Sequence, residues 1–114
     1  MEKCGGFEDN RGVIFWTSTE LLDFDYKYLT IGTIKPKGVR GGHYHKKTCE
    51  KLLCVKGPLL AVIDKETTTM ENGDIIDIPT SSTHLFINIG DEEAFFIEFK
   101  DRIFAENDKD TFTE

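Results

Sequence analysis

The stretch His43-Tyr44-His45-Lys46-Lys47-Thr48-Cys49-Glu50 decides the fold expected of this chain. Side chains two residues apart on a β-strand point to the same face, so His43 and His45 are expected side by side. If residues 46–49 form a tight turn, Glu50 lies on the neighbouring antiparallel strand and faces the same interior. His84, the last of the three histidines, opens a later strand of similar character. The pattern predicts three imidazoles and one carboxylate converging inside a barrel.

Such a group of side chains is typical of a site for a first-row transition metal with open coordination positions. Glu50 could instead pair with Lys51 at the start of a strand. However, the strand face of Glu50 continues into Leu52 and Cys54, so the carboxylate should be buried and should need a cation or a metal. We therefore expect zinc, iron, manganese or nickel, without a preference among them. The expected ligands are His43, His45, Glu50 and His84.

Length and composition indicate one small domain over residues 1–114. A chain of 114 residues can build one core but not two. The net charge of −7 argues against a nucleic-acid binder, which needs a basic surface. No apolar run reaches membrane-spanning length, and the N-terminus does not resemble a signal peptide. We expect a cytoplasmic protein whose cysteines, Cys4, Cys49 and Cys54, are thiols.

Short apolar segments separated by turn residues run through the chain. Many short strands at regular spacing indicate an all-β sandwich or barrel. The barrel is expected over about residues 26–99, followed by a polar tail at 101–114 with Phe104 and Phe112 as candidate anchors. Residues 64–68 look like a polar loop, and 17–20 could cap one helical turn. The expected strands are 13–16, 26–34, 50–55, 59–63, 75–78, 84–89 and 94–99.

Several of these strands are apolar on both faces. Leu53 and Val55 lie opposite the face of Glu50, and Leu85 and Ile87 lie opposite the face of His84. A one-layer monomeric barrel would show cleaner alternation of apolar and polar residues. The outer face should therefore be covered by a second sheet or by another subunit, and we expect a homodimer.

Two blocks of spaced residues resemble the paired signature motifs of the cupin superfamily. The first is His43-x-His45-x4-Glu50-x6-Gly57, and the second is Gly73-x5-Pro79-x4-His84-x3-Asn88. The resemblance covers about residues 26–99. It departs from the usual motifs at Gly38, one residue closer to the first histidine, and at Ser81, where glycine is usual. It implies a single-domain cupin, which is an all-β jelly roll.

The run from Gly38 to Lys47 resembles the sugar-nucleotide-modifying cupins. These are the dTDP-4-keto-6-deoxyhexose 3,5-epimerases, the sugar 3,4-ketoisomerases and the cupin domains attached to capsular-sugar reductases. Asp9-Asn10-Arg11-Gly12 looks like the D-x-R-G that often opens such domains, and residues 104–108 look like a ketoisomerase tail. In these families the arginine before the histidine commonly helps to bind the nucleotide diphosphate. The resemblance thus implies that Arg40 binds substrate, a role that suits the planar guanidinium fork.

The three groups differ at residues that matter for the chemistry. The 3,5-epimerases use a tyrosine acid on a late strand, but the last tyrosine here is Tyr44. The ketoisomerases commonly lack the glutamate and work without metal, whereas Glu50 is present here. The reductase-attached cupins carry H-Y-H followed by E-K, like Glu50-Lys51, and bind zinc. These comparisons favour a metal-binding member of the group.

The implied reaction is proton transfer beside a sugar ketone, in an isomerase or epimerase of a nucleotide-linked keto-deoxysugar. The reaction needs a base, an acid and a group that stabilises the enediolate oxygen. His43 or His45 is the base if no metal binds; if metal binds, the base must be another group or a metal-bound hydroxide. Two other classes stay open: a small metal-dependent cupin dioxygenase, and a non-catalytic cupin that binds a sugar or a metal.

Overall fold

Short strands and one helical turn build the part of the chain that the computed structural model describes, residues 1–103 and 110–113. A turn at residues 9–12 joins β2 to β3, which pair with each other. The elements are β1 (Glu2–Lys3), β2 (Gly5–Asp9), β3 (Gly12–Trp16), α1 (Thr19–Leu22), β4 (Tyr28–Ile34), β5 (Val39–Tyr44), β6 (Glu50–Lys56), β7 (Leu59–Ile63), β8 (Glu66–Met70), β9 (Asp74–Ile78), β10 (His84–Asn88), β11 (Ala94–Lys100) and β12 (Phe112–Thr113).

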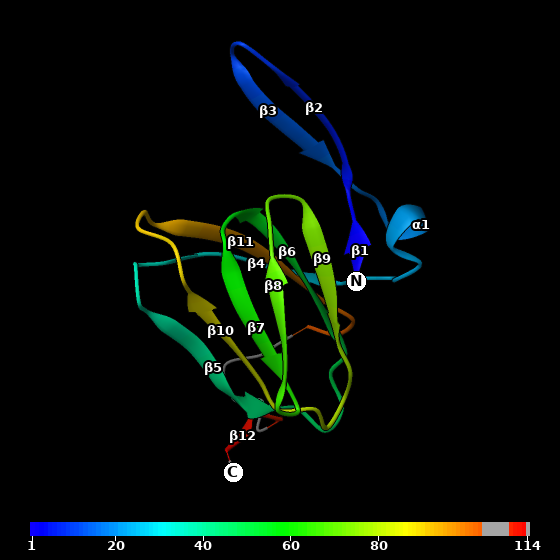
Figure 1. Cartoon of the computed structure of the whole chain (residues 1–114). Helices are drawn as coiled ribbons and strands as arrows, with labels where there is room; N and C mark the ends of the chain where they lie inside the picture. The colour runs from blue at the N-terminus through cyan, green and yellow to red at the C-terminus, as the bar shows by residue number, and fades with distance from the viewer. Residues whose placement is uncertain (104–109, 114) are drawn as a thin grey trace.

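Two antiparallel five-stranded sheets face each other and enclose the core (Figure 1). The first sheet has the strand order β1-β9-β6-β11-β4, and the second has the order β12-β5-β10-β7-β8. The β2–β3 hairpin projects from this body, as the blue arm in Figure 1 shows. The all-β jelly-roll prediction is confirmed, and strands far apart in sequence become neighbours within each sheet.

Apolar side chains from alternate positions of both sheets fill the space between them. Leu52 and Cys54 of β6 meet Phe96 of β11 and Phe86 of β10 in this inner core. Cys54 is fully buried, and this burial raises the pKa of its thiol to about 12. Cys54 is thus a small core residue rather than a reactive thiol.

A second apolar cluster lies on the outer face of the first sheet. Leu53, Ile75 and Phe99 point outward there and pack against Leu22 of α1. The helical turn expected at residues 17–20 forms over Thr19–Leu22, and the hydroxyl of Ser18 accepts the Leu21 N–H at its N-terminus. The part of this face formed by β6, β9 and β11 is therefore covered by the N-terminal segment of the same chain, whereas Ile31 of β4 is 76% exposed.

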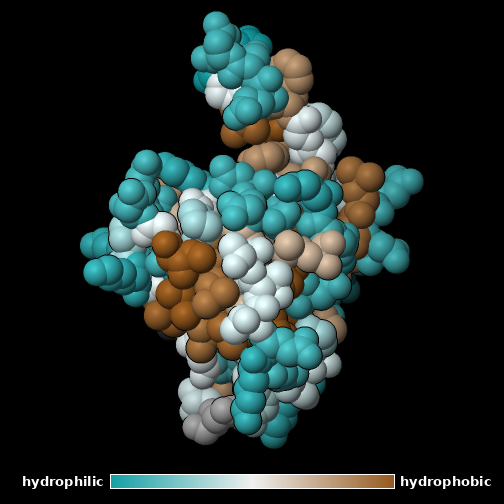
Figure 2. Space-filling model, viewed as in Figure 1, coloured by the Kyte–Doolittle hydropathy of each residue, from teal (hydrophilic) through white to brown (hydrophobic). Residues whose placement is uncertain are grey.

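The outer face of the second sheet carries a cross-strand row of apolar residues. Ile87 of β10 lies between Val39 of β5 and Leu60 of β7, and Leu85 lies beside Val62. Figure 2 shows the resulting apolar area over these strands. No helix or strand of residues 1–103 and 110–113 packs over it, and Val39 is 57% exposed. The apolar outer face inferred from the sequence is thus present.

The prediction of a polar loop at residues 64–68 is right for Asp64 and Lys65 but wrong for residues 66–68. Residues Glu66–Met70 form β8, which pairs along its whole length with β7. Thr67, Thr68 and Thr69 are β-branched, and such residues suit a half-exposed strand although they are polar. The turn lies earlier, where Asp64 and Lys65 adopt positive φ angles of 48° and 73°.

In the described residues, no helix has the length and apolar character needed to cross a bilayer. The candidate anchor Phe112 lies in β12, where its ring stacks on Tyr44 with the centroids 5.5 Å apart. Phe104 lies outside the described residues. The cytoplasmic location stays a prediction.

Asn88 joins three backbone segments at one end of the barrel. Its side-chain amide donates to the carbonyl oxygens of Ile34 and Glu92, at 2.8 and 2.7 Å, and its oxygen accepts the Gly90 N–H at 2.9 Å. The residue is 1% exposed. Asn88 therefore acts as a structural residue at this end of the barrel.

Replacing Asn88 by alanine should lower the free energy of unfolding by roughly 2–4 kcal/mol, because each buried group left without a partner costs about 1–3 kcal/mol. Urea denaturation of both proteins gives the difference. Asn72→Ala is a matched control, because Asn72 accepts one hydrogen bond, from the exposed Gly57 N–H. Equal losses in the two variants would contradict the role of Asn88.

Candidate functional site

The predicted ligand residues converge between the two sheets. His43 lies on β5 and opposite His84 of β10, both in the second sheet. Glu50 opens β6 in the first sheet, so the expectation that it lies on the strand next to His43 is wrong. Residues 46–49 cross from one sheet to the other, and Glu50 faces the histidines across the barrel interior. The convergence itself agrees with the sequence prediction.

A bulge at Gly41–Gly42 turns β5 so that both Arg40 and His43 face the interior. Arg40 lies opposite Phe86, and His43 lies opposite His84, so β5 has one residue more than β10 between these pairs. Gly41 and Gly42 have φ angles of 106° and 84°, which favour glycine. A Cβ on Gly41 would lie 2.5 Å from the His84 carbonyl oxygen. Only glycine therefore fits this close strand approach.

The three imidazoles form a tight group. The ring centroid of His43 lies 4.5 Å from that of His84 and 5.0 Å from that of His45. One ring nitrogen from each histidine lies within 4.8 Å of the others. This is a separation at which three nitrogens can bind one metal ion.

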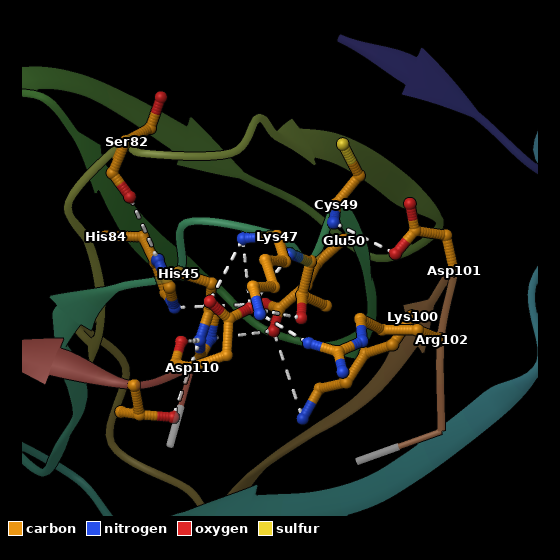
Figure 3. Close-up of polar contacts among 12 residues, drawn as sticks. His45, Lys47, Cys49, Glu50, Ser82, His84, Lys100, Asp101, Arg102 and Asp110 are labelled. Carbon is orange, nitrogen blue, oxygen red and sulfur yellow. Dashed lines mark hydrogen bonds and ion pairs between the residues drawn. The ribbon is translucent and has the colours of Figure 1, made fainter. Parts of the chain in front are cut away.

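Glu50 is the buried carboxylate of the group, with 2% of its surface exposed (Figure 3). Its Oε1 lies 2.9 Å from Nε2 of His45, and its Oε2 lies 3.8 Å from Nε2 of His84. Oε1 also lies 3.9 Å from Nζ of Lys100. Neither carboxylate oxygen has a hydrogen-bond donor in good geometry among the described residues.

His45 is held between two acceptors. Its Nδ1 lies 2.8 Å from the carbonyl oxygen of Asp110, and a carbonyl can only accept, so Nδ1 carries a hydrogen. Its Nε2 faces the Glu50 carboxylate, which also accepts. A neutral imidazole has one N–H and cannot satisfy both. The ring is therefore an imidazolium, or Nε2 and the carboxylate share a cation.

In the metal-free site, burial and the charge of Glu50 determine the pKa values of the three histidines. Burial and the neighbouring His84 and His45 lower the pKa of His43 to about 4. Burial also lowers the pKa of His84. Burial acts in the same direction on His45, but the Glu50 carboxylate and the Asp110 carbonyl outweigh it and raise the pKa of His45. Burial alone would raise the pKa of Glu50, but its contacts with His45 and Glu98 and the charges of the histidines outweigh burial and lower this pKa.

Two further charged side chains enter the interior from β11. Lys100 lies directly opposite Glu50 on the neighbouring strand, and Glu98 lies opposite Leu52. Burial and the charge of Glu50 raise the pKa of Glu98 to about 7. Neither residue belongs to the site predicted from the sequence. The signal was present: two charges stand at alternate positions of an otherwise apolar strand, on the same face as Phe96.

A cavity of about 300 Å³ lies between the sheets beside this group, a volume at the lower end of small-molecule sites. His43, His84 and Glu98 line its inner part, and Phe86 and Phe96 form apolar walls. Arg40 lies at its exposed edge, where Nε and Nη2 donate to the carbonyl oxygen of Thr33 at 3.2 and 3.1 Å. Arg40 and two of the histidines thus border the same space.

The residues fit a bound divalent metal. Three imidazole nitrogens surround a common point, and a buried carboxylate without good donors lies beside them. The 2.9 Å between Nε2 of His45 and Oε1 of Glu50 is close to the spacing of adjacent ligand atoms around such an ion. A cation there would also remove the acceptor conflict at His45.

The chain belongs to the polysaccharide biosynthesis C-terminal domain family, whose model matches residues 7–112. Among curated proteins it is similar to the UDP-2-acetamido-2,6-β-L-arabino-hexul-4-ose reductase of Pseudomonas aeruginosa. The two are 27% identical over 88 residues, which cover 70% of this chain and 24% of the reductase. The chain therefore spans about a quarter of that relative's length.

Solved structures of proteins from sugar and polysaccharide biosynthesis are also similar to this chain. The capsular polysaccharide assembling protein CapF of Staphylococcus aureus is 28% identical, with a TM-score of 0.69 over 79% of this chain and 27% of CapF. A 3,4-ketoisomerase from Helicobacter canadensis shares the fold, with a TM-score of 0.77 at 18% identity over 98% of this chain and 87% of the enzyme. The resemblance to the sugar-nucleotide-modifying cupins is thus confirmed.

In metal-free protein the pKa values of His43 and His45 should be shifted in opposite directions. We expect His43 near pKa 4 and His45 above its ordinary value, measured from the NMR shifts of the ring protons against pH. Glu50→Gln should lower the pKa of His45, because the main interaction that favours the imidazolium is lost. Indistinguishable pKa values for His43 and His45 in the wild-type protein would contradict this electrostatic description.

Proposed function

We propose that this domain binds one divalent transition metal and isomerises or epimerises a nucleotide-linked keto-deoxysugar by proton transfer beside the ketone. The ligands in this proposal are His43, His45, Glu50 and His84. The observation that carries it is the cavity that joins the histidines to Glu98 and to Arg40. Its apolar walls and few converging polar groups suit a small polar substrate held in one orientation.

Arg40 is proposed to bind the diphosphate of the substrate. Its guanidinium lies at the exposed edge of the cavity and already uses Nε and Nη2 on the Thr33 carbonyl. That bond fixes the orientation of the planar group at the entrance. A fixed guanidinium matches phosphate oxygens better than a flexible ammonium does. The relative named as a reductase of a UDP-linked 4-keto sugar supports this class of substrate.

Glu98 is proposed to move the proton. Histidines that bind metal through their lone pairs cannot also act as bases, so another group must remove the C–H proton. Glu98 lines the same cavity as His43 and His84. Burial raises its pKa, to about 7 in the metal-free group, and a carboxyl group with a raised pKa can accept and return a proton near neutral pH. When bound, the metal would supply Lewis acidity for the oxygen that gains charge.

We also propose that the domain forms a homodimer through the outer face of the second sheet. The row of Val39, Leu60 and Ile87 is apolar and continuous across three strands. Contiguous apolar surface of this kind marks association sites in soluble proteins. A second copy of the chain offers the same patch, as a two-fold interface requires.

The metal proposal predicts close to one transition-metal ion per chain in purified protein, measured by elemental analysis. His84→Ala should lower metal affinity strongly, because it removes one of four ligands. Thr83→Ala is a control beside it, since Thr83 contacts Asp64 and lies outside the ligand group. Wild-type protein that stays metal-free after incubation with zinc, iron, manganese and nickel would overturn the proposal.

The substrate proposal predicts that Arg40 variants lose nucleotide binding, whereas Glu98 variants lose proton transfer. UDP or dTDP should raise the melting temperature of the wild-type protein, because a ligand bound only by the native state stabilises it. Arg40→Ala should weaken nucleotide binding by about 1.5–3 kcal/mol, the range for a hydrogen bond to a charged group. Arg40→Lys should restore only part of it.

Glu98→Gln, by contrast, should keep nucleotide binding and metal content but stop deuterium uptake from D2O into a UDP- or dTDP-linked 4-keto-6-deoxysugar. Mass spectrometry of the recovered sugar nucleotide measures this exchange. Deuterium exchange that continues at the wild-type rate in Glu98→Gln would show that another group transfers the proton. If no nucleoside diphosphate or sugar nucleotide binds and oxygen is consumed with metal-loaded protein, the dioxygenase interpretation holds instead.

For the dimer, light scattering should give twice the chain mass of 13.0 kDa at micromolar concentration. Val39→Lys should produce monomers, because it places a charge within the apolar row. Ile31→Lys serves as the control, since Ile31 is exposed on the other sheet. A single-chain mass at every concentration of wild-type protein would rule the dimer out.

A further inference from the structure

The carboxylate of Asp110 lies at the centre of the loop that connects His45 to Glu50 (Figure 3). It accepts the backbone N–H groups of Lys46, Lys47 and Thr48 at 3.0 Å, and the Thr48 hydroxyl at 2.7 Å. Asp110 is 4% exposed, and it lies 62 residues after Thr48 in the sequence. Successive N–H groups that converge on one anion fix the conformation of a loop.

The backbone of the same residue holds His45. The Asp110 carbonyl oxygen lies 2.8 Å from Nδ1 of the imidazole, so the hydrogen is on Nδ1 and Nε2 points to Glu50. Asp110 therefore contacts the ring of one proposed ligand with its carbonyl and the loop that leads to the next ligand with its carboxylate. The relative positions of His45 and Glu50 depend on both contacts.

The segment that carries Asp110 is docked independently of these bonds. Residues Phe112–Thr113 form β12, which pairs with Tyr44 and His43 at the edge of the second sheet. The Phe112 ring stacks on Tyr44, and Nζ of Lys46 lies 4.4 Å from the centre of the Phe112 ring. Nη1 of Arg102 lies 3.5 Å from Oδ2 of Asp110 and balances part of its charge.

We propose that residues 110–113 form a positioning element for the metal site, with Asp110 as the residue that fixes His45 in one tautomer and one ring orientation. The proposal rests on the proposed function for the identity of the bound ion, but the tautomer of His45 does not depend on it. Groups that hold the outer nitrogen of a metal-binding histidine commonly change metal affinity by about 10–100-fold when they are removed.

The test compares Asp110→Asn with Asp101→Asn in the full chain. Asp101 accepts the Cys49 N–H at 3.0 Å, so it holds the other end of the same loop. An asparagine at position 110 turns an amide N–H2 toward backbone N–H donors and should release the loop. Phe112→Ala is a second variant, which weakens the docking of β12 but leaves the loop bonds in place.

Two measurements decide the proposal. Long-range ¹H–¹⁵N spectra of the histidine rings report the tautomer of His45, in zinc-loaded protein and in metal-free protein at alkaline pH. Competition with a chromogenic chelator reports the zinc affinity. In Asp110→Asn and Phe112→Ala we expect the Nδ1–H signal of His45 to exchange rapidly or disappear, and zinc affinity to fall about 10–100-fold. Asp101→Asn should keep both close to wild type.

The outcomes are separable. The positioning role is overturned if the variants at 110 and 112 keep the Nδ1–H signal and match Asp101→Asn in zinc affinity. If Asp110→Asn does not fold, Phe112→Ala alone decides. If wild-type protein binds no zinc, the tautomer of His45 in the metal-free variants alone supports or overturns the role of Asp110, and the metal proposal is decided by incubation with iron, manganese and nickel.

Discussion

The buried carboxylate of Glu50 is the constraint on which the rest of the barrel interior depends. An ionised carboxylate away from water is costly unless positive charge and hydrogen-bond donors surround it. The second sheet supplies His43 and His84, His45 follows directly after β5, and the first sheet supplies Lys100 on the strand beside Glu50. Even so, its oxygens lack donors in good geometry among the described residues. The interior is therefore built around a position that suits a cation.

The ligand group was predictable because strand alternation and motif spacing act together. Alternation places His43 and His45 on one face, and it places Glu50 on the same face as Leu52 and Cys54. A four-residue connection, however, can close a hairpin or cross between sheets, and both leave Glu50 facing inward. The sequence therefore predicts that these side chains converge, as they do, but with the wrong strand neighbours.

Other features could not be predicted from local pattern. Arg40 and His43 are three residues apart, so regular alternation would place them on opposite faces of β5; the bulge at Gly41–Gly42 brings both to the cavity. Asp110 acts over a separation of more than 60 residues, and nothing in its neighbourhood marks it as a partner of His45. Glu98 stands out in the sequence as a charge in an apolar strand, but only the pairing of β11 with β6 shows that it lies on the strand next to Glu50.

The arrangement divides the cavity into regions with different physical character. At the exposed edge Arg40 offers a fixed positive charge in water, where an anionic group can bind with little loss of hydration. Farther in, Phe86 and Phe96 form apolar walls around the space beside His43, His84 and Glu98. Charges interact more strongly between apolar walls than in open water, and burial has already raised the pKa of the Glu98 carboxyl group there. A substrate whose charged group and reacting carbon lie several bonds apart would use both regions at once. A sugar linked to a nucleoside diphosphate has this shape. Its diphosphate can stay at the exposed edge of the cavity and does not have to enter the buried interior around Glu50.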